Sequence, residues 1–349
     1  MMEISNYLRG WIKDLDLYTP GETREGYIKL ASNENNYGPS PKVIKAIREN
    51  AGSVYKYPYR DAELKQRIAE YCDCGAENVI AGNGSDELID MIVKTFKGPV
   101  VSVYPTYSEY KLMAEALNEC YYGINLDPGF YFSVERFERD KRFGKSNIVI
   151  LCSPNNPDGG VIGREDMEQI LNSGKITVID EAYVEFYGNS IASLISGYDN
   201  LVVLRTFAKA FGLAGLRVGY ALSGEEIINY LGKVKPPFNV NSLAQEAAVA
   251  ALDDVEYMRG CVDRITGDKR ILEKKLIAKG FKTFKSEANF ILVDVSPEMN
   301  ADGFFKIMLA NGIIVRRFNR FEGFDGEYVR ISIGTEEENK ILFRALKTL

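Results

Sequence analysis

Two ionisable residues, Asp180 and Lys209, follow apolar segments of this 349-residue chain. Asp180 closes the run 176–180 and Lys209 comes after the run 201–205, and both runs are typical of buried strands. Burying a charged group at the edge of such a sheet costs free energy, so such a group is expected to be paired with an opposite charge or to serve in binding or catalysis. A lysine there can lose its proton and attack a carbonyl carbon, and a neighbouring carboxylate can hold a positively charged ring nitrogen.

The chain contains no histidine, which sharpens the interpretation of Lys209. Catalysis by Ser-His or Cys-His pairs and metal binding through histidine are excluded, and we expect no metal site. Acid–base chemistry near neutral pH must therefore come from lysine, tyrosine, cysteine, carboxylates or a cofactor.

Composition places the chain among globular proteins of about two domains, with 46% hydrophobic and 26% charged residues. A net charge of −6 argues against a nucleic-acid partner, which would need a basic surface. No apolar run is long enough to span a membrane, and the first residues do not form a secretory signal. Five cysteines without a C-x-x-C pair fit reduced thiols, so we expect a cytoplasmic protein.

Apolar runs alternate with helical patterns such as 87–96, which predicts an α/β fold around a mostly parallel sheet. Continuous apolarity within each run indicates strands covered on both faces. The predicted strands are 100–104, 148–152, 176–180 and 201–205.

Pro236-Pro237 ends a helical pattern over 225–234 and marks a predicted domain boundary. We predict an N-terminal arm over 1–35 that belongs to the small domain, a large domain over 36–236 and a small α+β domain over 237–349. The expected elements of the small domain are strands at 288–295, 313–316 and 328–333 and a last helix opened by a capping box at 335–338.

Five candidate residues follow predicted strands, namely Gly84, Tyr107, Asn156, Asp180 and Lys209. Parallel sheets bind ligands at the carboxyl ends of their strands. The shared placement of these five residues is therefore stronger evidence for a binding site than any one of them alone. Taken singly, each has a plainer explanation: a turn capped by Ser85 or Asp86, a core tyrosine, or a turn-forming asparagine.

Thr206 and Arg217 flank Lys209 and carry groups suited to a phosphate, although an isolated Arg217 would more simply form a surface salt bridge. A nucleophilic lysine, a carboxylate for a ring nitrogen and a phosphate site are together what a pyridoxal 5'-phosphate enzyme requires.

With these residues assembled, the chain resembles the aspartate aminotransferase superfamily of fold type I, and within it the histidinol-phosphate branch. The resemblance runs nearly end to end. It is carried by KLASNENNYGPSP at 29–41, DEAY at 180–183, RTFAKAFGLAGLR at 205–217 and VRISIGTEEEN at 329–339. It implies a seven-stranded, mostly parallel sheet in the large domain, a smaller C-terminal domain and an N-terminal arm. It also implies a cytoplasmic C2 homodimer with shared active sites.

The resemblance also implies residue roles. Lys209 would be the Schiff-base lysine and proton carrier, Asp180 would pair with the ring nitrogen, and Tyr183 with Asn156 would bond the ring hydroxyl. The remaining cofactor contacts would come from Tyr107 by stacking, from Gly84, Ser85, Asp86, Thr206 and Arg217 around the phosphate, and from Tyr57 of the neighbouring subunit.

For substrates, the resemblance implies glutamate or 2-oxoglutarate and a phosphorylated amino alcohol. Arg330, helped by Arg316, would bind either anion in a ping-pong cycle, and Tyr18 and Asn33 would close over the substrate. Rival functions on the same residues are an aromatic amino-acid aminotransferase, a decarboxylase of a phosphorylated amino acid, and a cofactor-binding module without catalysis.

The chain departs from the family pattern at Ala208, Asp158 and Asn36, none of which removes a catalytic group. The aromatic and basic segment 317–325 is a further departure. It is either an exposed connector between two strands or part of the substrate end of the site.

Overall fold

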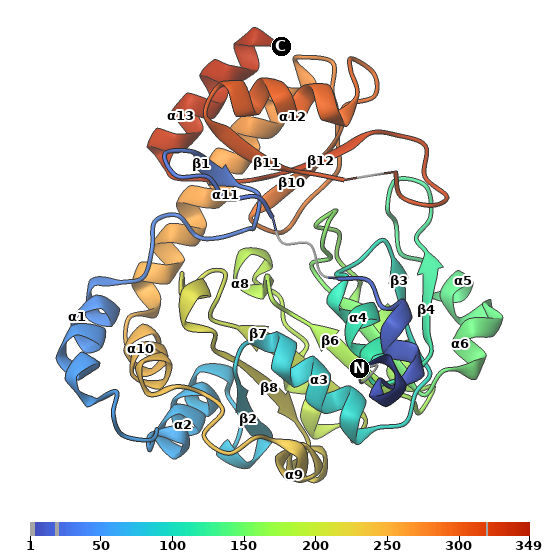
Figure 1. Ribbon diagram of the computed structural model, residues 1–349, viewed down its shortest axis with the longest axis vertical. Coiled ribbons are helices and arrows are strands. Elements are labelled where there is room, and N and C mark those ends of the chain that lie inside the picture. The colour runs from blue at the N-terminus through green and yellow to red at the C-terminus, as the bar shows by residue number, and fades with distance from the viewer. Residues whose placement is uncertain (1–3, 18–20, 319) are drawn as a thin grey trace.

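The computed structural model describes residues 4–17, 21–318 and 320–349 and contains two β-sheets with their covering helices (Figure 1). The larger sheet has seven strands in the order β2-β8-β7-β6-β5-β3-β4. Their bounds are β2 (Val79–Gly82), β8 (Gly219–Ser223), β7 (Leu201–Thr206), β6 (Ile176–Asp180), β5 (Ile148–Cys152), β3 (Val100–Tyr104) and β4 (Tyr121–Asn125).

The neighbours from β4 to β7 pair in parallel, and β8 runs antiparallel to both β7 and β2. Every residue of β5 and β7 is buried, which is the reason that β5 and the first four residues of β7 are continuously apolar rather than alternating. The predicted α/β class and mostly parallel sheet are confirmed, and so are the four predicted strands. The carboxyl ends of β3, β5, β6 and β7 therefore meet at one edge.

Helices cover the larger sheet on its two faces. Helix α3 matches the predicted helical segment, and α9 matches the one before the double proline. The helices are α1 (Pro41–Asn50), α2 (Asp61–Cys72), α3 (Ser85–Thr95), α4 (Glu109–Ala116), α5 (Val134–Arg139), α6 (Lys141–Lys145), α7 (Arg164–Leu171), α8 (Val184–Tyr187) and α9 (Glu225–Val234).

The second sheet has five strands in the order β1-β11-β12-β10-β9 and lies beyond the carboxyl edge of the first (Figure 1). Its strands are β1 (Ile28–Leu30), β11 (Ile313–Arg317), β12 (Tyr328–Ser332), β10 (Phe290–Asp294) and β9 (Lys282–Thr283). The C-terminal helices are α10 (Ser242–Leu252), α11 (Val255–Ile277), α12 (Ala301–Ala310) and α13 (Glu336–Ala345).

Strand β1 comes from the N-terminal segment and pairs in parallel with β11, so the start of the chain contributes to the second sheet. Helix α13 begins with the predicted capping box between Thr335 and Glu338. The division at residues 35 and 236 stays a prediction. None of the described helices is long and apolar enough to cross a membrane.

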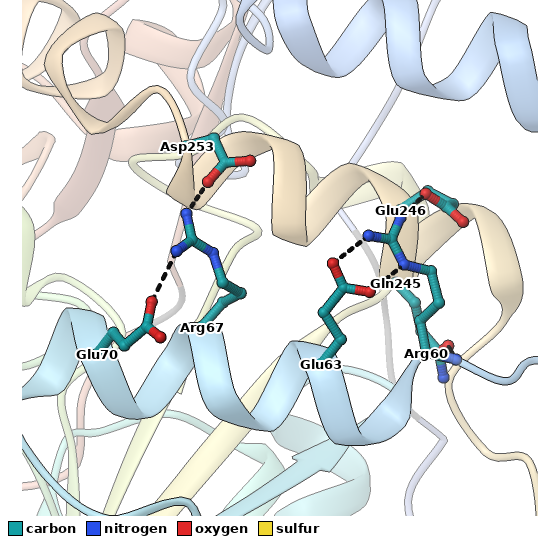
Figure 2. A network of polar contacts seen from close by, with 7 residues as sticks. All are labelled: Arg60, Glu63, Arg67, Glu70, Gln245, Glu246 and Asp253. Carbon is teal, nitrogen blue, oxygen red and sulfur yellow. Dashed lines mark hydrogen bonds and ion pairs between the residues drawn. The ribbon is translucent and has the colours of Figure 1, made fainter.

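Helices α2 and α10 are joined by a network of charged side chains, shown in Figure 2. The backbone N–H of Arg60 donates to Gln245 Oε1 at 2.9 Å, and its guanidinium pairs with Glu63 and with Glu246, whose side chain is only 9% exposed. Arg60 immediately precedes α2 and follows the segment that carries Tyr57. The network therefore fixes where that segment leaves the body of the protein.

We expect Arg60→Ala to lower the free energy of unfolding by about 2 kcal/mol, because it leaves the Glu246 carboxylate shielded from water and unpaired. Arg259→Ala is the matched control, since Arg259 pairs with Glu256 on the surface of α11 and both side chains are mostly exposed. That change should cost no more than about 0.5 kcal/mol. Urea unfolding of both variants measures the difference, and equal losses would contradict the role given to Arg60.

Candidate active site

A cavity of about 370 Å³ lies between the carboxyl edge of the larger sheet and the second sheet. It brings together twelve of the residues singled out from the sequence. They are Asn33, Ser85, Asp86, Tyr107, Asn156, Asp180, Tyr183, Thr206, Lys209, Arg217, Arg316 and Arg330.

Lys209 follows β7 and points its amine toward the N-terminal segment, where Nζ donates to the backbone oxygen of Ser32 at 3.3 Å. Burial, together with the positive charge of Arg330, lowers the pKa of the Lys209 amine to about 8. At pH 7 a lysine with such a pKa is neutral in roughly one molecule in ten, far more often than an ordinary lysine. It can therefore act as a nucleophile and as a proton carrier.

Asp180 is the last residue of β6 and is 2% exposed. Its Oδ1 accepts from the backbone N–H of Ala182 at 3.0 Å, and its Oδ2 accepts from the hydroxyl of Tyr110 at 2.6 Å. Burial raises the pKa of the carboxyl to about 6 despite these bonds. The Asp180 carboxylate therefore lines the cavity with a negative charge that a cationic ring nitrogen would stabilise.

Tyr110 was missed by the sequence reasoning. It is the second residue of α4, whereas Tyr107 lies in the segment before that helix, so no helical spacing in the sequence pairs the two. Its ring packs edge-on against Tyr107, with ring centres 5.6 Å apart. Tyr110 therefore connects the tyrosine predicted to stack on a ring with the carboxylate predicted to bond the same ring.

The far end of the cavity contains the start of α3. Gly84 has φ of +81°, and a Cβ at this position would lie 2.6 Å from Arg217 Nη2, so the turn requires glycine. The side chain of Asp86 accepts from Arg217 at 2.7 Å and from the hydroxyl of Tyr107 at 3.1 Å. Together with Thr206, this end offers the N–H groups of an eleven-residue helix, a guanidinium and a hydroxyl to an anion.

The opposite wall comes from the N-terminal segment and the second sheet. Asn33 Nδ2 donates to the Tyr183 hydroxyl at 2.9 Å, and the guanidinium of Arg330 donates to Asn156 Oδ1 and to the Ala31 backbone oxygen. Residues from both sheets therefore meet over Lys209.

Two predicted site residues do not line the cavity. Gly84 shapes the turn behind the cavity without lining it, and Tyr57 is 75% exposed and stacks on Phe238 with ring centres 4.5 Å apart. Tyr18 lies outside the described residues.

The departures from the family pattern have local explanations. Ala208 lines the cavity, the carboxylate of Asp158 accepts from Asn155 and from the backbone of Gly160, and Asn36 donates to Glu338. Segment 317–325 is not a purely exposed connector, because Phe321 is 9% exposed and lines the cavity together with Phe318.

A half-buried lysine, a buried carboxylate and a set of groups suited to an anion along one strand edge define a class of enzyme that binds a flat, anionic cofactor beside a reactive amine. The profile of the family described as aminotransferase class I and II matches residues 25–346, and the chain belongs to this family.

Within the family, the chain is 39% identical to a histidinol-phosphate aminotransferase from Thermoanaerobacter pseudethanolicus, over 99% of both chains. The crystal structure of the histidinol-phosphate aminotransferase from Clostridium acetobutylicum is 27% identical, with a TM-score of 0.85 over 92% of this chain and 98% of that chain. The Sinorhizobium meliloti histidinol-phosphate aminotransferase, solved in complex with pyridoxal-5'-phosphate, has a TM-score of 0.88 over 98% of both chains. At 24% identity, that likeness shows the fold.

Proposed function

We propose that the chain is a pyridoxal 5'-phosphate-dependent aminotransferase that exchanges an amino group between L-histidinol phosphate and 2-oxoglutarate, giving imidazole-acetol phosphate and glutamate. The observation that carries the proposal is the single cavity shared by Lys209, Asp180 and the arginine pair Arg316 and Arg330. The family and the full-length similarity to histidinol-phosphate aminotransferases support the same reaction.

The side chains present fit the cofactor. The carboxyl of Asp180 is buried, and its raised pKa shows that an ionised form is poorly stabilised by what surrounds it, which a cationic ring nitrogen would correct. At the other end, the start of α3, Thr206 and Arg217 suit a phosphate. Tyr107 would stack on the ring, Asn156 and Tyr183 would bond its hydroxyl, and Gly84 lets Ser85 and Asp86 approach the phosphate.

When bound, the cofactor supplies an electron sink for the bond broken at the substrate Cα. The chain itself supplies the proton carrier, because Nζ of Lys209 loses its proton more readily than an ordinary lysine. Arg330 and Arg316 bind the anionic group of each substrate in turn, and Asn33 positions the Tyr183 hydroxyl. Because one guanidinium pair serves a carboxylate and a phosphate, two dissimilar substrates can use one site.

The active unit is proposed to be a cytoplasmic homodimer. The segment before α2 exposes Val54, Tyr55, Tyr57 and Tyr59, a density of exposed apolar side chains that is typical of a surface made to be covered. The predicted contact of Tyr57 with the neighbouring subunit's cofactor agrees with this exposure.

The function is tested by comparing kcat/KM for histidinol phosphate, tyrosine and phenylalanine as amino donors to 2-oxoglutarate. We expect histidinol phosphate to be favoured by about a hundredfold or more, because its phosphate offers the two arginines more negative charge and one more acceptor oxygen than a carboxylate does. Addition of glutamate should change the absorbance of the holoenzyme. An enzyme that prefers tyrosine would contradict the proposed substrate, and release of carbon dioxide from a phosphorylated amino acid without amino transfer would identify the decarboxylase.

A further inference from the structure

The connector between β11 and β12 is fixed to the larger sheet rather than free in solvent. Asn125, at the end of β4, donates through Nδ2 to the Glu322 backbone oxygen at 3.0 Å, and the Glu322 N–H donates to the Tyr104 hydroxyl at 3.2 Å. Gly323 has φ of +82°, and a Cβ there would lie 2.3 Å from Asn125 Nδ2, so only glycine permits this approach. The second sheet is thereby joined to the ends of β3 and β4.

The aromatic side chains of the connector pack in a chain that ends at the cavity. Phe321 stacks on Tyr328, with ring centres 5.1 Å apart. It also packs edge-on against Phe130, which follows β4 in the chain, with ring centres 6.0 Å apart. Phe318 packs against Phe321 with ring centres 5.2 Å apart. The position of the Phe318 ring is therefore set by the buried cluster behind it.

Arg316 and Arg330 are direct register partners on the antiparallel strands β11 and β12. Like charges directly opposite each other destabilise a sheet, and the cost grows where water is partly excluded. Phe318 lies two residues after Arg316 and hence on the same face. The Cζ atoms of Arg316 and Arg330 lie 5.9 and 5.7 Å from the centre of its ring, within the range of cation–π attraction.

We propose that Phe318 is a positioning residue that holds Arg316 and Arg330 together, so that the pair can bind a substrate phosphate as a unit. Its ring attracts both guanidiniums and offsets their mutual repulsion before the anion arrives. Arg330 is also held by its bonds to Asn156 and Ala31, and its Cζ lies 5.2 Å from the ring centre of Phe290. Phe318 therefore acts as the contact that both guanidiniums share. This inference rests on the proposed function, and it concerns the substrate end of the site rather than the cofactor.

The test measures anion binding by the cofactor-loaded enzyme, with inorganic phosphate as the probe in isothermal titration calorimetry. We expect Phe318→Leu, which keeps an apolar side chain and loses the ring, to raise the Kd for phosphate about tenfold. In steady-state assays, the KM values for glutamate and for the phosphorylated substrate should rise together, with kcat changed by less than about twofold. Phe318→Tyr, which keeps the aromatic face, should restore phosphate affinity to within about twofold of the natural chain.

Phe324→Leu is the matched control. Phe324 belongs to the same connector and stacks on Phe130 at 4.7 Å, and it does not line the cavity. Its loss should affect thermal stability while leaving the Kd for phosphate unchanged. Should Phe318→Leu fail to fold, Phe318→Met repeats the comparison.

Equal phosphate affinity in Phe318→Leu and the natural chain would overturn the proposal. A matching loss of affinity in Phe324→Leu would also overturn it, because the effect would then belong to the connector as a whole. Failure of the natural chain to use histidinol phosphate would instead refute the proposed substrate. The phosphate titration would still decide the role of Phe318 in that case.

Discussion

Lys209→Ala is expected to lower kcat on the order of 10⁴-fold or more while the cofactor still binds noncovalently. Lys209 is the single lysine among the described residues that line the cavity. Its pKa of about 8 makes it an amine able to accept and return a proton near neutral pH. The groups proposed to hold the cofactor, Asp180 and Arg217 among them, are untouched by the change. Steady-state turnover, with the cofactor content of each preparation measured by absorbance, checks both parts of the prediction.

The chain offers a matched control in a buried lysine that lies outside the cavity. Lys269 in α11 also has a pKa lowered to about 8 by burial, but its Nζ donates to the backbone oxygens of Ser286 and Ala288 and it does not line the cavity. Lys269→Ala should reduce stability and leave kcat within about twofold. Multiple turnovers by Lys209→Ala, or an equal loss of kcat in Lys269→Ala, would refute the catalytic assignment of Lys209.

The parts of the fold that sequence reasoning predicted depend on local patterns. The strands β3, β5, β6 and β7 are mostly apolar because both faces of the sheet are covered, and that property is visible in the residues themselves. Because parallel strands end at one edge, the positions of Asp180 and Lys209 relative to their strands were enough to place both in one cavity.

The contacts that sequence reasoning could not predict join segments far apart in the chain. Nothing in the sequence near Glu322 indicates that its backbone bonds to Tyr104 and Asn125. Likewise, nothing near Arg60 indicates that it pairs with Glu246 of α10 (Figure 2). These contacts are decided by how the two sheets and their helices pack. The alternative left open for segment 317–325 could be settled only by that packing.

Asp180→Asn is expected to stabilise the cofactor-free protein at neutral pH. Burial raises the Asp180 pKa from 3.8 to about 6, so the ionised carboxyl is less stable in the folded chain than in the unfolded chain. This destabilising contribution is absent below about pH 4, grows as the pH rises through 4 to 6 and is complete above pH 6. Asparagine cannot ionise, its oxygen can still accept from Ala182, and the Tyr110 hydroxyl can accept from its amide.

The gain in unfolding free energy should therefore reach up to about 3 kcal/mol above pH 6 and vanish toward pH 4. Thermal unfolding of the cofactor-free proteins between pH 4 and 8 measures it. A variant that is less stable at pH 7, or a difference that does not depend on pH, would show that burial of the Asp180 charge is not the cause.

The same substitution should lower kcat about a thousandfold, because an amide cannot hold the ring nitrogen in its cationic form.

Glu185→Gln separates the effect on stability from the effect on activity. Burial also raises the Glu185 pKa, to about 7, and its shielded carboxylate oxygens have no hydrogen-bond partner among the described residues, yet it lies outside the cavity. Glu185→Gln should add stability above pH 7 with kcat unchanged within about twofold. If only Asp180→Asn loses activity while both variants gain stability, Asp180 is a charge kept at the expense of stability because the cofactor needs it.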